Sequence, residues 1–285
     1  MYQKIVVAFD GSEYSKAALL EASNWIKKHG GSAVLVHAVF FDEEEFGAIP
    51  EQLEKRMIFG KHVCCQAKEE ISASLGINLE SIICEGEPHE TIVEIAGSKG
   101  SDLIAIGTHG RKGIKRLLMG SVTSAVIAGA PCDVLVVKKP CTVCTGTYGS
   151  VLVPFDGSQF SKKALDRACA LAKADGGSVT VLYVIPRYEE MIGFVKNDSI
   201  RQSLRQEASK IIDSAKDIAG AVGITVNTVV EDGYPSDSII ESAKKLKTDL
   251  IIIGSYGWQG INRAIMGSTT ERVIMDAPCP VLAVR

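Results

Sequence analysis

Three glycines and a serine between residues 106 and 121 have the spacing of a phosphate-binding loop. The segment reads IGTHGRKGIKRLLMGS, with Gly107, Gly110 and Gly120 followed by Ser121. Glycine lets a backbone approach a ligand closely, and the free N–H groups of a helix that begins near Ser121 would attract an anion. The segment is not a Walker A loop, because it contains no Gly-Lys-Ser or Gly-Lys-Thr and its glycine gap is too long.

The same spacing occurs again 147 residues further along the chain. IGSYGWQGINRAIMGS carries Gly254, Gly257 and Gly267, followed by Ser268. Other blocks recur as well: KIVVAFDGSEYSKAAL matches SVLVPFDGSQFSKKAL, and APCDVLVVK matches APCPVLAVR. Agreement over separated blocks predicts two copies of one domain. We expect a first domain over 1–139, a linker rich in Pro, Gly and Thr over 140–149, and a second domain over 150–285.

Length, charge and hydropathy narrow the class of protein. A chain of 285 residues is long enough for two domains. The net charge of -3 argues against a nucleic-acid partner. No apolar run reaches the roughly 20 residues of a transmembrane helix, and the N-terminus has no signal-peptide pattern, so we expect no membrane span and a cytoplasmic protein.

Apolar strands alternate with helical patterns in each copy. In the first copy we expect strands over 4–10, 32–40, 77–84, 102–107 and 133–138, and helices near 14–29, 50–75 and 89–99 and from Ser121. Strands rich in Val and Ile that alternate with helices predict a parallel sheet covered on both faces, which makes each copy a doubly wound α/β domain.

Ligands of such sheets bind at the carboxyl ends of the strands, where the strand order reverses. Asp10 and Asp156 end the first strands, and Gly107 and Gly254 end the fourth strands. If these strands are neighbours, their ends border one crevice. Ser121 and Ser268 would then supply hydroxyls to a phosphate or would be plain N-caps, and both interpretations stay open at this point.

These motifs resemble the universal stress protein family. Both copies match the Gly-x2-Gly-x9-Gly-Ser/Thr pattern of its ATP-binding members, and the first-strand V-x-F-D-G-S and last-strand A-P-C-x-V-L-x-V patterns are also similar. The resemblance implies a tandem protein with two HUP-type domains, similar to the adenine nucleotide alpha hydrolases. Each would be an open five-stranded parallel sheet in the order 3-2-1-4-5 with helices on both faces.

The resemblance also implies an adenine nucleotide as ligand, ATP or else AMP or ADP, with Mg²⁺ or Mn²⁺ on its phosphates. It places the adenosine near the end of the first strand, with adenine against the backbone of the second strand, and the phosphates along the glycine loop and the helix that follows. The implied residues of the first copy are Ala8, Phe9, Asp10, Ala38, Ile106, Gly107, His109, Gly110, Gly120, Ser121, Val122 and Thr123. Those of the second copy are Pro154, Phe155, Asp156, Val184, Ile253, Gly254, Tyr256, Gly257, Gly267, Ser268, Thr269 and Thr270.

Enzyme signatures that this fold can carry are missing. The chain contains neither His-Ile-Gly-His nor Lys-Met-Ser-Lys-Ser, and FDGSEYS does not supply the Ser-Gly-Gly-x-Asp-Ser of PP-loop pyrophosphatases. Tyr256 stands where the first copy has His109, so a general base common to both copies is not expected. We expect a nucleotide-dependent stress-response or signalling protein, with slow ATP hydrolysis at most and no assigned catalytic residue.

Cysteines suggest the alternative of a metal or redox sensor in which a nucleotide is only a structural ligand. Cys141 and Cys144 form a Cys-x2-Cys pair in the linker, and Cys64 and Cys65 follow His62 on the expected helix 50–75. Zinc needs four ligands in tetrahedral geometry, which two loosely related clusters do not establish, so free thiols are favoured. The remaining cysteines, in apolar contexts, are expected to be small core residues: Cys84, Cys132, Cys169 and Cys279.

The two glycine loops differ in charge. The first carries Arg111, Lys112, Lys115 and Arg116, whereas the second keeps only Arg263. Cations near a triphosphate strengthen binding, so we expect the first copy to bind ATP more tightly unless these charges are only a solvated face. The last strand of each copy is an apolar edge. In the resembled family such strands pair, which implies an intrachain pseudo-dimer and allows a homodimer of chains.

Overall fold

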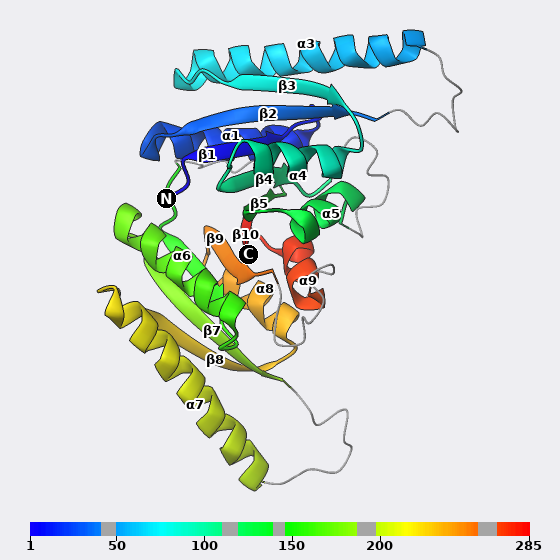
Figure 1. Cartoon of the computed structure of the whole chain (residues 1–285). Coiled ribbons are helices and arrows are strands. Elements are labelled where there is room, and N and C mark those ends of the chain that lie inside the picture. Colours follow the sequence, from blue (N-terminus) through cyan, green and yellow to red (C-terminus); the bar gives the residue numbers. More distant parts are fainter. Residues whose placement is uncertain (41–49, 110–118, 139–145, 187–197, 256–266) are drawn as a thin grey trace. The chain divides into compact units, whose positions relative to one another are not determined.

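The computed structural model describes residues 1–40, 50–109, 119–138, 146–186, 198–255 and 267–285. The chain divides into two compact units, Met1–Thr147 and Tyr148–Arg285, and each contains one copy of the repeat (Figure 1).

A five-stranded parallel sheet forms the centre of the first unit. Its strands are β1 (Lys4–Ala8), β2 (Ser32–Val39), β3 (Glu80–Glu85), β4 (Leu103–Gly107) and β5 (Asp133–Val137). They lie in the order β3-β2-β1-β4-β5, which confirms the predicted order. The third strand begins at Glu80 rather than at residue 77, because its pairing with β2 starts where Val34 faces Glu80.

Two pairs of helices cover the two faces of this sheet. They are α1 (Glu13–His29), α3 (Pro50–Leu75), α4 (Pro88–Ser98) and α5 (Ser121–Gly129). Helices α1 and α3 contact each other on one face, and α4 and α5 contact each other on the opposite face. Strands β4 and β5 are therefore buried throughout, as their continuous apolar sequences require, whereas the edge strand β3 is only half-buried.

The second unit repeats this arrangement. Its strands are β6 (Ser150–Pro154), β7 (Ser178–Pro186), β8 (Asn227–Gly233), β9 (Leu250–Gly254) and β10 (Val281–Val284), in the order β8-β7-β6-β9-β10. Helices α6 (Gln159–Asp175) and α7 (Asp198–Ala221) cover one face, and α8 (Pro235–Lys245) and α9 (Ser268–Asp276) cover the other. Two repeated doubly wound domains are thus present.

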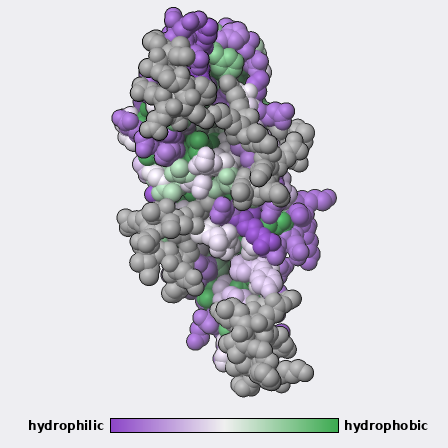
Figure 2. All heavy atoms as spheres, turned by 90° about the vertical axis from the view of Figure 1, so that its right-hand side faces the viewer, coloured by the Kyte–Doolittle hydropathy of each residue, from purple (hydrophilic) through white to green (hydrophobic). Residues whose placement is uncertain are grey.

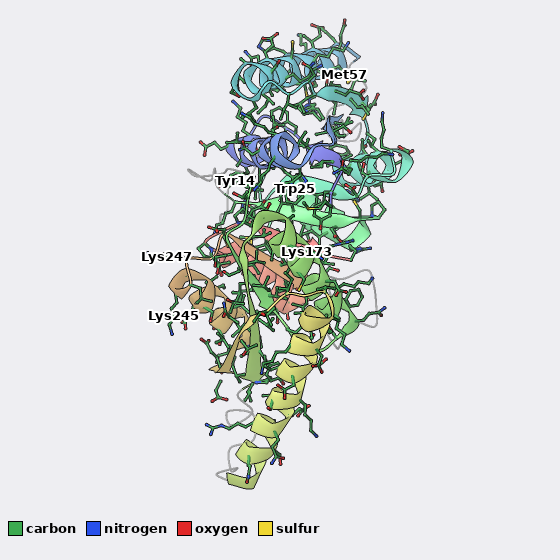
Figure 3. All side chains as sticks on the ribbon, turned by 90° about the vertical axis from the view of Figure 1, so that its left-hand side faces the viewer. Tyr14, Trp25, Met57, Lys173, Lys245 and Lys247 are labelled. Atoms are coloured by element: carbon green, nitrogen blue, oxygen red, sulfur yellow. The ribbon has the colours of Figure 1, made fainter. Side chains whose placement is uncertain are left out.

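Trp25 belongs to the core of the first unit. The side chain lies on α1, is 4% exposed and donates from Nε1 to the backbone oxygen of Tyr2 at 3.1 Å (Figure 3). Its ring centroid lies 4.2 Å from that of His29. A packing role for this tryptophan, rather than stacking on a ligand, is confirmed.

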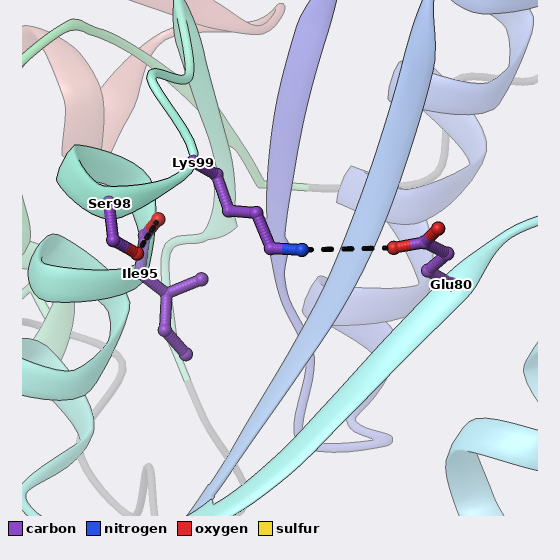
Figure 4. Close-up of polar contacts among 4 residues, drawn as sticks. All are labelled: Glu80, Ile95, Ser98 and Lys99. Carbon is purple, nitrogen blue, oxygen red and sulfur yellow. Dashed lines mark hydrogen bonds and ion pairs between the residues drawn. The ribbon is translucent and has the colours of Figure 1, made fainter.

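The outer surface of the first unit is mainly polar, with exposed apolar side chains at Ile58 and Phe59 on α3. Hydrophilic residues predominate among the coloured residues at its upper end when the molecule is viewed from the side on which β2 ends, with a few hydrophobic ones between them (Figure 2). Lys99, just after α4, reaches toward Glu80 on β3 with a nitrogen–oxygen distance of 3.9 Å (Figure 4). Both side chains are exposed, so this pair contributes little to stability. Within the described residues, no helix combines the length and apolar character needed to cross a membrane.

Candidate functional site

The strand order reverses between β1 and β4 in the first unit. These strands pair in parallel, from Ile5 opposite Leu103 to Val7 opposite Ala105, so their carboxyl ends share one edge. The same relation holds between β6 and β9 in the second unit. The sequence-based expectation that first and fourth strands are neighbours is confirmed, and each unit has the switch point at which ligands of this fold class bind.

Gly107 is required by the packing of α1. A Cβ atom at this position would lie 2.6 Å from Cβ of Tyr14 and 3.0 Å from the backbone nitrogen of Ser15. In the second unit, a Cβ atom at Gly254 would lie 2.7 Å from Cβ of Phe160. The fold alone therefore explains both glycines, whose spacing had suggested the close approach of a ligand.

Helix α5 begins without a side-chain cap. Its N-cap is Gly120, whose N–H donates to the carbonyl of Thr108 at 3.0 Å, and Ser121 is already the first helical residue. Gly267 and Ser268 have the same roles in α9. The plain N-cap interpretation of the two serines is therefore wrong. The N–H groups of the first helical turn have no acceptor inside the helix, and they form its positive end.

A threonine hydroxyl bonds each of these helices to a strand end. Thr123 donates from Oγ1 to the carbonyl of Gly107 at 2.8 Å, and Thr270 donates to the carbonyl of Gly254 at 3.0 Å. Both threonines are buried. A hydroxyl has a single proton to donate, so in this arrangement neither threonine offers the phosphate donor that was expected of it. The side chain of Ser121 is exposed, as is that of Ser268.

The loop after the first strand has the same geometry in both copies. Asp10 accepts the N–H of Ser12 at Oδ1 over 2.9 Å, and Asp156 accepts the N–H of Ser158 at the same distance. Ser12 is the N-cap of α1, and its Oγ accepts the N–H of Ser15 at 3.2 Å. Each aspartate is thus held in a fixed orientation at the carboxyl edge, where a carboxylate can accept hydrogen bonds from a sugar hydroxyl.

His109 lies directly beyond β4 and is 8% exposed. Its Nδ1 lies 3.1 Å from Oγ1 of Thr108, and its ring centroid lies 5.3 Å from that of Tyr14. Tyr14 lies in the first turn of α1 (Figure 3). The contact of His109 with ribose or phosphate stays a prediction.

The other predicted residues fall into three groups. Ala38 faces Cys84 on the neighbouring strand, and Val184 faces Glu231, so both lie near the carboxyl ends of their strands. Side chains that are buried in the core, or half-buried at a strand end or in the first turn of α5 or α9, are those of Ala8, Phe9, Ile106, Val122, Pro154, Phe155, Ile253 and Thr269. Several residues lie outside the described part of the chain: Gly110, Arg111, Lys112, Lys115, Arg116, Tyr256, Gly257, Trp258, Gln259 and Arg263.

Ser255 is a feature that sequence reasoning missed. It follows β9, is completely buried, and among the described residues its Oγ has no hydrogen-bond partner. Thr108, at the matching position, has the His109 ring beside its hydroxyl. The sequence signal for this difference is the residue that follows each hydroxyl, which is His109 in the first copy and Tyr256 in the second.

The cysteines of α3 and the nearby His62 differ in their exposure. Cys64 is buried, whereas Cys65 and His62 are exposed, so the expected cluster does not face one side of the helix. No three His, Cys, Asp or Glu side chains gather around a possible ion anywhere in the described ranges. Cys141 and Cys144 lie outside those ranges.

Thiol environments also correct one expectation about the core. Only Cys169, of the four cysteines expected there, is buried, and Cys84, Cys132 and Cys279 are half-buried. Burial raises the pKa of the Cys169 thiol to about 11. The pKa of Cys65 is raised by its hydrogen bond to Glu69, and the charge of that carboxylate adds to the effect. Both thiols are therefore poor nucleophiles at neutral pH.

Comparison with known proteins agrees with the fold and with the repeat. The profile of the universal stress protein family matches residues 1–138 and 147–285. A universal stress protein of Methanocaldococcus jannaschii is 34% identical over 141 residues, which cover 48% of this chain and 82% of that protein. One from Mycobacterium tuberculosis is 27% identical over 296 residues, which cover 99% of this chain and 96% of that protein.

A solved structure shows the same fold over the full length. The crystal structure of a universal stress protein from Archaeoglobus fulgidus has a TM-score of 0.77 at 23% identity, and the match covers 99% of this chain and 98% of that one. The family profile spans both copies of the repeat. The chain therefore belongs to the universal stress protein family.

Proposed function

We propose that each unit binds an adenine nucleotide, ATP in the first place, at the carboxyl edge between its first and fourth strands. The observation that carries this proposal is the uncapped helix start at Gly120 and Gly267, repeated in both copies beside a switch point. A helix N-terminus without a side-chain cap leaves N–H groups for an anion, and phosphate groups of nucleotides bind at such helix starts. The two aspartates at the same edge suit the sugar.

Two sets of groups at the carboxyl edge of the sheet suit the two parts of a nucleotide, the nucleoside and the phosphates. Asp10 and the backbone of Ala38 would hold the ribose and base, while the first-turn N–H groups of α5 and the Ser121 hydroxyl would hold the outer phosphates. The residues implied by the family resemblance remain our assignment for both copies, with Thr123 and Thr270 as positioning residues. Mg²⁺ or Mn²⁺ would neutralise charge on the phosphates, which themselves supply oxygen ligands.

Binding rather than turnover is the proposed activity. His109 lies beside the helix start, since a Cβ atom at Gly120 would lie 3.6 Å from its Cα, and the second copy carries Tyr256 in its place. Because only the first copy holds this base, we propose at most slow ATP hydrolysis, and only in the first unit. The bound nucleotide would then act as a signal through conformation or assembly, including pairing of the two units as a pseudo-dimer or of two chains as a homodimer.

Counting the nucleotide that remains on gently purified protein tests the proposal. Mass spectrometry of the released ligand is expected to find two ATP per chain, or two after incubation with ATP and Mg²⁺. Gly120→Asp and Gly267→Asp each introduce a carboxylate at a helix start and are expected to remove one ATP each. Glu69→Gln, on the exposed face of α3, is the matched control. Absence of nucleotide after incubation would overturn the proposal.

A further inference from the structure

His37 lies on β2, one residue before Ala38, and its imidazole is 7% exposed. Its ring fills the space beneath α3, since a Cβ atom at Gly60 of that helix would lie 2.5 Å from its Cδ2. The long helix α3 contacts β2 (Figure 1), so this polar ring is enclosed between the sheet and that helix. A buried polar group is unfavourable unless the group is hydrogen-bonded. The hydrogen-bond partner of the His37 ring therefore indicates the role of this side chain.

The partner is a backbone carbonyl at the proposed site. Nδ1 of His37 lies 2.8 Å from the oxygen of Phe9, in a buried contact. A carbonyl oxygen only accepts, so Nδ1 carries the proton and donates it. This carbonyl belongs to the peptide that joins Phe9 to Asp10, and the N–H of the same peptide lies 3.4 Å from Oγ of Ser15. Side chains from β2 and α1 thus hold both polar groups of the peptide that carries Asp10.

We propose that His37 is a positioning residue for the base and ribose half of the first nucleotide site, an inference that rests on the proposed function. Without its donor, the Phe9 carbonyl would stay buried and unpaired, or the peptide would rotate and take the Asp10 carboxylate with it. The phosphate half is held by other elements, through the bond from Thr123 to Gly107. Loss of the His37 donor therefore affects base and ribose recognition and leaves the phosphate half in place.

The second copy provides the comparison within the chain. Tyr183 stands at the position of His37, on β7. Its hydroxyl is at the far end of a six-membered ring, beyond the place that Nδ1 of a histidine occupies. The two sites are thus expected to hold their Asp-bearing peptides by different contacts.

Three substitutions test the proposal in a Gly267→Asp background, where only the first site binds. His37→Asn keeps a donor close to the place of Nδ1, His37→Leu has nearly the same shape as asparagine without the donor, and His37→Tyr introduces the residue of the second copy. Calorimetry measures the affinity for ATP, and displacement of ATP measures the affinity for inorganic tripolyphosphate. The ratio of the two affinities cancels a loss of folded protein, which lowers both equally.

The leucine and tyrosine variants are expected to lose about tenfold in ATP affinity, the equivalent of one hydrogen bond. Their affinity for tripolyphosphate should stay within about twofold, and the asparagine variant should bind ATP within about threefold of the parent. Equal ATP affinities for asparagine and leucine, or equal losses for both ligands, would overturn the role of His37. If the unsubstituted chain binds neither ligand, the proposed function fails instead.

Discussion

The hydroxyl of Thr123 donates to the carbonyl of Gly107 at 2.8 Å, across sixteen residues of sequence. The bond joins the first turn of α5 to the last residue of β4. Gly107 itself lies against the start of α1, where its hydrogen leaves room for Tyr14. One strand end is thus in contact with the first turns of two helices, and the same relation exists between Thr270 and Gly254 in the second unit.

Removing the hydroxyl of Thr123 is expected to destabilise the first unit. Thr123→Val keeps the shape but loses the buried bond, at a cost of about 1–2 kcal/mol in the free energy of unfolding. Urea unfolding followed by tryptophan fluorescence measures it in a Trp258→Phe background, where Trp25 is the sole reporter. Thr123→Ser keeps the hydroxyl and is the control. A valine variant as stable as the serine variant would contradict the role of the bond.

A methyl group added at Gly107 is expected to destabilise the protein, whereas one added at Gly97 is expected to stabilise it. Gly107→Ala forces a Cβ atom against the backbone of Tyr14, and overpacking of this kind costs about 1–3 kcal/mol. Gly97 lies in α4, where an added Cβ atom meets nothing within 4 Å, so Gly97→Ala should stabilise the helix by up to about 1 kcal/mol. Thermal unfolding measures both variants. Gly107→Ala should lower the unfolding temperature and Gly97→Ala should raise it, and equal shifts in the two variants would contradict the packing described.

A charge at the start of α9 is expected to weaken the second site. Glu271 lies in the first turn of α9, whereas the first turn of α5 contains no acidic residue and has Ser124 at the matching position. A carboxylate there competes with phosphate for the positive end of the helix. In a Gly120→Asp background, Glu271→Ser should raise ATP affinity about two- to fivefold at low salt, by the usual size of charge–dipole effects. Calorimetry at low and high salt measures it, and the gain should shrink in high salt.

The reciprocal change is the matched control for that prediction. Ser124→Glu in a Gly267→Asp background should weaken the first site by a similar factor. If both variants changed the ATP affinity in the same direction, the effect would not come from the charge at the helix end.

The first site is expected to bind ATP more tightly than the second. Arg111, Lys112 and Lys115 occur only in the first glycine loop, and the second site has the Glu271 carboxylate instead. Calorimetry on Gly120→Asp and Gly267→Asp at low salt compares the surviving sites. Tighter binding by the chain with Gly120→Asp, which keeps only the second site, would refute the expected order.

Glu69 is expected to slow the reaction of Cys65 with thiol reagents. The hydrogen bond and charge of Glu69 raise the pKa of Cys65, so less thiolate is present at a given pH. Glu69→Gln removes the charge, lowers this pKa and should make Cys65 react faster at pH values below it. Alkylation rates against pH measure the shift, in a background with Cys141→Ser and Cys144→Ser. Glu70→Gln, at a neighbouring exposed position, should leave the rate nearly unchanged.

Local pattern was enough to predict most of the fold. The repeat is visible as matching blocks of sequence. The strands and helices depend on neighbouring residues, because the periodicity of apolar residues reflects burial on one face or both. The strand order came from the resemblance to a family and is confirmed by the pairing of β1 with β2 and β4. The start of β3 was three residues off, because a strand end depends on the partner strand.

The amino-acid sequence by itself determined that two α/β domains occur in tandem and that glycines, serines and aspartates recur at their strand ends, since these are properties of residue type and spacing. Only the tertiary structure decided what each of these residues contacts. Gly107 accommodates α1, Thr123 bonds to a strand end, Gly120 rather than Ser121 caps α5, and His37 holds the Phe9 carbonyl. The contacts of Gly107, Thr123 and His37 join elements that are separate in the chain, and such contacts are set when the elements pack together rather than by local pattern.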